Sequence, residues 1–132
     1  MSDTEKARIV RDYARGCNGA EAFHQHSLAR RLFYTDGVRF IAETCGAYWL
    51  VDAIASYVST SKAVQAEDFQ VWTLKVHTVC GRTMLVCTNG NDDVAIVSQK
   101  IEYTDFPSEL LPFKLFCENN GDGFTLMFPE ER

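Results

Sequence analysis

The chain has 132 residues, of which 46% are hydrophobic and 23% are charged, and its formal net charge is −5 at pH 7. This composition is typical of one globular domain that buries a core without a disulfide or metal. The apolar runs are broken by Asp52, Lys75 or Arg82, well short of the ~20 residues that cross a bilayer. The first residues lack the pattern of a signal peptide, so we expect a cytoplasmic protein with no membrane partner.

The cysteines are odd in number, widely spaced and without a C-x-x-C motif: Cys17, Cys45, Cys80, Cys87 and Cys117. Such a set in a cytoplasmic chain predicts reduced thiols. Several of them lie in helix- or strand-like apolar patterns, where a free cysteine packs as a small hydrophobic residue.

Residues 3–15 form the first predicted helix, with Asp3 or Thr4 as the N-cap and Gly16 as the stop. Three arginines share one face of this helix at steps of three and four residues: Arg8, Arg11 and Arg15. They form either a small anion-binding patch or an exposed face partly paired with neighbouring carboxylates.

Two further helices are predicted, over 38–45 and 47–59. Thr35 or Asp36 caps the first, and Gly46 suits the left-handed residue that ends it. The second helix is apolar around most of its circumference, which is typical of a buried helix lying against a sheet. Asp52 is its only charged residue. This carboxylate is either buried, and then a functional candidate, or it marks the solvent edge of the helix.

From Phe69 the apolar period changes from 3.6 residues to two, which indicates a sheet. Alternating segments lie near 69–76, 84–88, 97–103, 113–118 and 124–128, and turn-forming Gly and Asn residues lie between most of them. We therefore expect an α+β fold with N-terminal helices packed on one face of a four- to five-stranded antiparallel meander sheet. The chain is expected to be a single domain, 1–132, with a helical part (1–66) and a sheet part (67–132).

His24 and His26 are the closest pair of strong metal ligands, and in an extended segment they project the same way. No third ligand has a suitable spacing, no cysteine has a catalytic signature, and no nucleotide-binding glycine motif is present. The sequence therefore predicts no cofactor, no metal site and no assignable catalytic set. An enzyme that uses His24, His26 or a cysteine near Asp52 stays an alternative.

Charge is distributed unevenly along the chain. Residues 1–66 carry eight basic and seven acidic groups, whereas residues 67–132 carry five basic and eleven acidic groups. An acidic surface docks on a basic partner and disfavours nucleic acid. The residues proposed for such an interaction are Asp92, Asp93, Glu102, Asp105, Glu118 and Asp122.

Four segments of the chain resemble a family of small proteins of unknown function found in bacterial, plasmid and phage genomes. They are Tyr34-Thr-Asp-Gly-Val38, Gly46-Ala-Tyr-Trp-Leu-Val-Asp-Ala-Ile-Ala-Ser56, Phe69-Gln-Val-Trp72 and Gln99-Lys-Ile-Glu-Tyr-Thr-Asp-Phe-Pro107. The resemblance spans roughly residues 20 to 128, which makes the arginine face before it a local addition. It implies action on host machinery, for example as an inhibitor of a defence complex such as an anti-CRISPR.

Three functions follow from these observations. The leading hypothesis is a non-catalytic protein-binding or regulatory module. Its expected partner is a protein, either one with a basic or nucleic-acid-binding surface or a second copy of the chain. The second is a small hydrolase-like enzyme that uses His24, His26 or a cysteine. The third is nucleic-acid binding through the N-terminal arginines, including Arg30 and Arg31.

Overall fold

The computed structural model describes residues 2–16, 22–77, 81–91, 94–102, 104 and 106–132. Within these residues the helices are α1 (Asp3–Arg15), α2 (Asp36–Cys45), α3 (Tyr48–Thr60) and α4 (Lys62–Gln65). The strands are β1 (Phe23–Gln25), β2 (Leu32–Thr35), β3 (Phe69–Val76), β4 (Thr83–Thr88), β5 (Val97–Ile101), β6 (Phe113–Asn119) and β7 (Phe124–Met127). Two short 3₁₀ turns, η1 (Ser108–Leu110) and η2 (Pro129–Glu131), complete the described elements.

Side-chain caps fix where the predicted helices begin. The Thr35 hydroxyl accepts a hydrogen bond from the Val38 amide at the start of α2, and Gly46 ends that helix with φ 62°, as expected. The N-cap of α1 is Ser2, one residue before the predicted candidates, and its hydroxyl accepts from the Glu5 amide. No helix in the described part of the chain is long and apolar enough to cross a membrane.

The described strands form one mixed seven-stranded sheet in the order β1-β2-β7-β6-β3-β4-β5. Strands β3, β4 and β5 are an antiparallel meander, but β6 returns to the other side of β3. Strand β7 then pairs in parallel with β2, which pairs antiparallel with β1. The α+β class is confirmed, and the prediction of a four- to five-stranded antiparallel meander is wrong.

The two missed strands lie in the part of the chain expected to be helical. They contain three and four residues, too few for an alternating pattern to stand out. Strand β2 pairs with the sequence-distant β7: Leu32 lies opposite Phe124, and the Phe124 amide donates to the Arg31 carbonyl at 2.8 Å. Strand β1 joins the sheet through β2. A long-range contact of this kind leaves no local signal in the sequence.

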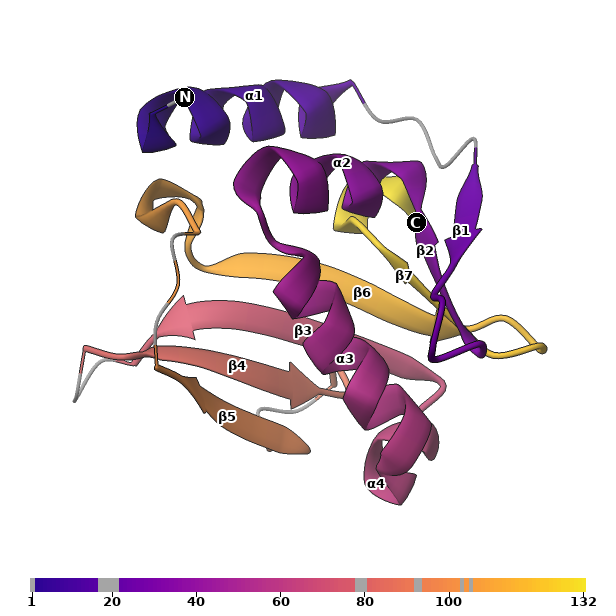
Figure 1. The fold of residues 1–132 in the computed structure, drawn as a ribbon. Coiled ribbons are helices and arrows are strands. Elements are labelled where there is room, and N and C mark those ends of the chain that lie inside the picture. The colour runs from indigo at the N-terminus through magenta and orange to yellow at the C-terminus, as the bar shows by residue number, and fades with distance from the viewer. Residues whose placement is uncertain (1, 17–21, 78–80, 92–93, 103, 105) are drawn as a thin grey trace.

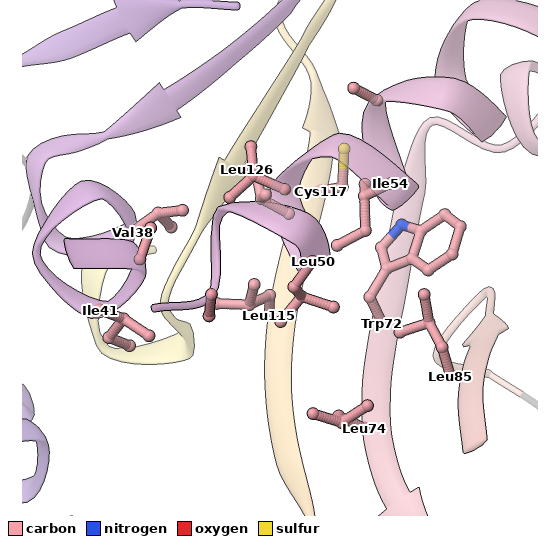
Figure 2. Packing of buried hydrophobic residues seen from close by; sticks show 14 of the residues in the cluster. Val38, Ile41, Leu50, Ile54, Trp72, Leu74, Leu85, Leu115, Cys117 and Leu126 are labelled. Atoms are coloured by element: carbon pink, nitrogen blue, oxygen red, sulfur yellow. The ribbon is translucent and has the colours of Figure 1, made fainter. Parts of the chain in front are cut away.

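The core lies between the helices and one face of the sheet. Helix α3 crosses β3 and β6 (Figure 1), and its buried side chains Leu50 and Ile54 pack with Trp72 and Leu115 (Figure 2). This confirms that the apolar helix is a central core element. Helices α1 and α2 cover the β2–β7 end of the same layer, where Tyr13 lies edge-on to Phe128.

Candidate functional site

A cleft lies on the helix side of the molecule, between α3 and the connection that joins β1 to β2. Its volume is about 470 Å³. The connection is held in shape by hydrogen bonds from the His26 amide to the Leu32 carbonyl and from the Leu32 amide to the Ala29 carbonyl, both 2.9 Å. The lining residues are His26, Ser27, Leu28, Ala29, Asp52, Ala55, Ser56 and Ser59.

His26 and Asp52 meet in this cleft. The His26 Nε2 atom lies 2.8 Å from Asp52 Oδ1. The other ring nitrogen, Nδ1, accepts from the backbone amides of Leu28 (3.2 Å) and Ala29 (2.9 Å). An atom that accepts from two N–H groups carries no proton, so the hydrogen-bond pattern assigns the ring proton to Nε2, which donates to Asp52.

This arrangement leaves His26 without a ring nitrogen for catalysis. A general base needs an unprotonated nitrogen within reach of the substrate, and here Nδ1 is used by the connection's own backbone. The imidazole is also mostly covered, with 11% of its side chain exposed. The contacts therefore favour a structural role: His26 shapes the turn and orients the carboxylate of Asp52.

Asp52 itself faces solvent, with 65% of its side chain exposed. Of the two alternatives for this carboxylate, the structure shows the solvent edge of α3. Ser56 and Ser59 follow at four and seven residues, so they lie along the same side of the helix as Asp52. Because an imidazole with its proton on Nε2 is neutral, Asp52 provides the charge among the residues that line the cleft.

Leu28 stands at the rim of the cleft and is 89% exposed, the most exposed of the large apolar residues in the described chain. Sequence reasoning missed this residue, because a single leucine between Ser27 and Ala29 shows no periodicity. The only sequence feature that could have drawn attention to it is its place beside His26 in a short connection.

His24 lies on β1, where its ring packs against that of Tyr34 with centroids 5.6 Å apart. Within the described residues, no group of three or more His, Cys, Asp or Glu side chains is arranged to hold a metal ion. His24 and His26 thus contact different partners, Tyr34 and Asp52.

Three cysteines are described, and all are buried: Cys45, Cys87 and Cys117. Burial raises the pKa of the Cys87 thiol to about 12, and the nearby Glu67 carboxylate adds to this effect. Burial also raises the pKa of Cys117, with a smaller contribution from Cys87. These thiols keep their protons at neutral pH, and the thiol form is a poor nucleophile. Cys17 and Cys80 lie outside the described residues.

The arginines proposed as an anion patch are exposed on α1. Arg11 donates to the carbonyl of Glu109 at 2.6 Å, so it holds α1 against η1. Arg15 lies 3.7 Å from Asp12, as expected for a partly paired face. The guanidinium groups of Arg11 and Arg15 are thus both engaged by other groups of the same chain.

The acidic residues proposed for docking lie at opposite ends of the sheet. Glu102 follows β5 and pairs with Lys100, whereas Glu118 on β6 pairs with Arg132. Asp122 lies in the β6–β7 turn beside a second hollow lined by Phe23 and Phe33. The other proposed residues, Asp92, Asp93 and Asp105, lie outside the described residues.

Fold and site together define a small α+β protein with a mixed sheet, one helical layer and a solvent-facing acidic cleft. Residues 9–132 match the model of a family of unknown function, DUF6876, and the chain therefore belongs to that family. The match begins before residue 20, so it includes Arg11 and Arg15, which the sequence resemblance had left outside.

No curated protein matches the chain. A crystal structure of a protein of unknown function from Enterococcus faecalis resembles it with a TM-score of 0.54 and 16% sequence identity. The alignment covers 84% of this chain and 98% of that one. At this level of identity the similarity concerns the fold alone.

Proposed function

We propose that this protein is a non-catalytic protein-binding module whose cleft receives a cationic side chain of its partner. The observation that carries the proposal is the combination of an oriented, exposed carboxylate, Asp52, with the nearly fully exposed Leu28 on the rim of the same cleft. An exposed apolar residue beside a polar recognition group is a frequent feature of binding surfaces.

The shape of the cleft suits lysine or arginine. Such a side chain has an apolar stem and a charged head, and the two parts need different surroundings. Here Leu28, Ala29 and Ala55 offer apolar surface for the stem, and Asp52 accepts hydrogen bonds from the head. The hydroxyls of Ser56 and Ser59 add polar partners along the same helix face.

A partner from a host defence complex is a narrower form of this proposal. Surfaces that bind nucleic acid are rich in lysine and arginine, so they supply the side chains that suit the cleft. Genomic neighbourhood tests this narrower form: location beside defence or anti-defence genes supports it, and location in a metabolic operon counts against it.

Affinity capture from a bacterial lysate, with two pairs of matched variants, tests the binding function. Asp52→Asn and Leu28→Ala change the cleft, whereas Glu102→Gln and Val94→Ala change an exposed carboxylate and an exposed apolar residue elsewhere. The proposal predicts a protein that wild type and both controls retain and both cleft variants lose, with weaker capture at high salt. Capture that is equal for all five proteins, or the absence of any captured protein, contradicts the proposal.

A further inference from the structure

The face of the sheet that points away from the helices carries an apolar centre. Side chains alternate along each strand, so the residues between the core positions point to this opposite face. Half-buried apolar side chains of this face, none of them part of the core cluster, lie on four neighbouring strands: Phe69, Val71, Met84, Val86, Phe116 and Met127. Phe33 on β2, opposite Thr125, is a further half-buried apolar residue on the same face.

The register brings these side chains together. Phe116 on β6 lies opposite Val71 on one side and Met127 on the other, and its ring lies edge-on to Phe69 with centroids 5.0 Å apart. Val71 in turn lies opposite Thr88 on β4, and Val86 lies two pairs further along, opposite Thr73. Part of this apolar patch is covered by the chain itself, since the Arg132 guanidinium lies over the Phe69 ring at 4.2 Å and Gly90 lies close to Phe69 and Val71. The remaining half-buried apolar area is unusual on a sheet face that meets only water.

Charge is segregated at the two ends of this surface. Three exposed lysines lie at one end: Lys114 on β6, and Lys75 and Lys100, which flank Met84 in one row across β3, β4 and β5. Glu102 is the acidic group at this end and pairs with Lys100. At the other end Glu118 lies opposite Phe69 and pairs with Arg132. Asp68, which precedes Phe69 and accepts a hydrogen bond from Asn119, and Asp122 in the β6–β7 turn belong to the same end of the strands. One end is therefore net basic and the other net acidic.

We propose that this face binds the same face of a second copy of the chain, around a two-fold axis that passes near Phe116 and runs across the strands. Such an axis reverses strand direction between the copies, so Lys114 of one chain lies over Glu118 of the other, and the apolar centres meet. The surface is thus complementary to itself, which a two-fold dimer requires. Sheets that stack face to face pack about 10 Å apart with their strands roughly aligned.

This arrangement is independent of the proposed binding function, since the cleft lies on the opposite, helical side of the sheet. A dimer built in this way displays two clefts on its outer surfaces. Two clefts held in fixed relation bind a partner that has two suitable sites more tightly than one cleft does.

Sedimentation equilibrium of the full chain from micromolar to millimolar concentration tests the dimer. The expected result is a mass of twice 14.9 kDa at the upper end of the range. Lys114→Glu and Glu118→Lys each place like charges opposite each other, and we expect each to raise the dissociation constant about tenfold or more. The double variant Lys114→Glu/Glu118→Lys restores opposite charges and should dimerise like wild type.

Two further proteins complete the experiment. Lys62→Glu, an exposed lysine on α4, is the matched control and should dimerise normally. Phe116→Ser removes the apolar centre and should be monomeric, with circular dichroism and a thermal transition confirming that it is folded. A wild-type protein that is monomeric throughout, or a dimer that Lys114→Glu, Glu118→Lys and folded Phe116→Ser leave unchanged, overturns the proposal.

Discussion

Thr35 and Glu131, 96 residues apart in the chain, share a buried hydrogen bond of 2.7 Å between the threonine hydroxyl and Oε1 of the glutamate. The same hydroxyl accepts from the Val38 amide at the start of α2, and the same carboxylate oxygen accepts from the Phe128 amide. This network joins η2 to the N-terminus of α2, where a negative charge is favourable. It therefore holds β2, α2 and the end of β7 together.

Glu131→Ala should destabilise the fold by about 2 kcal/mol, because it leaves the Phe128 amide and the Thr35 hydroxyl without their partner. The free energy of unfolding from urea titration measures the effect. Glu130→Ala is the control, since Glu130 is an exposed neighbour, and it should change stability by less than about 0.5 kcal/mol. Equal losses in the two variants would contradict the role of the network.

Gly37→Ala should destabilise wild type but stabilise the Glu131→Ala variant. A Cβ at position 37 would lie 2.7–2.9 Å from the carboxyl atoms of Glu131, so the carboxylate would have to leave its hydrogen bonds. Without that carboxylate the substitution is an ordinary glycine-to-alanine change in a helix, worth about 1 kcal/mol in favour of folding. A double-mutant cycle in urea checks the reversal of sign. Additive effects would show that Glu131 does not crowd Gly37.

Gly123→Ala should prevent β2 from pairing with β7. A Cβ at this position overlaps the backbone carbonyl of Arg31, the group that accepts from the Phe124 amide. Both the Cβ and the Arg31 carbonyl are fixed by the backbone, so no flexible side chain can move to relieve the overlap. We therefore expect the free energy of unfolding to fall by at least about 3 kcal/mol, or the variant not to fold. Gly16→Ala is the control, because its new Cβ meets only ordinary contacts. Wild-type amide protection in β2 of the Gly123→Ala variant would disprove the pairing.

Stability should fall as the pH rises from 9 toward 12. Burial raises the pKa of the Cys87 thiol from its ordinary value of 9.0 to about 12 in the folded protein. The unfolded chain therefore loses this proton first, and ionisation favours unfolding across that window. Cys87→Ala should show a shallower fall than wild type when the free energy of unfolding is measured at several pH values. Parallel curves for the two proteins would show that Cys87 makes no such contribution.

The sequence predicted those elements whose signal is local. The alternation in 69–76 and the caps at Thr35 and Gly46 act within a few residues, and the structure confirms them. Strand β2 depends on the sequence-distant β7, and the short length of β1 and β2 leaves no period to recognise. Local reasoning could not detect these contributions to the sheet.

The candidate site likewise combines features with a local sequence signal and a contact that depends on sequence-distant residues. His26 and Asp52 each stood out in the sequence, one as a strong ligand and the other as a charge in an apolar helix. Their contact depends on how the β1–β2 connection folds over α3, which in turn depends on the unrecognised strands. The residue types were therefore predictable and their pairing was not.

His26→Asn and His26→Gln should separate the two roles of the imidazole. Asparagine places an oxygen near the position of Nδ1, so it can still accept from the Leu28 and Ala29 amides but does not reach Asp52. Glutamine places its amide near the position of Nε2 and can still donate to Asp52. We expect His26→Asn to stay within about 1 kcal/mol of wild type and His26→Ala to lose about 2 kcal/mol, because alanine removes both the mostly covered ring and the acceptor of the Leu28 and Ala29 amides.

Amide hydrogen exchange at Leu28 and Ala29 distinguishes the variants, with protection retained in His26→Asn and lost in His26→Gln and His26→Ala. Capture of the partner should follow the opposite order, because only glutamine still orients Asp52. If protection and capture fell together in all three variants, the ring would act as a single packing unit, and the separate hydrogen-bonding roles of Nδ1 and Nε2 would be wrong.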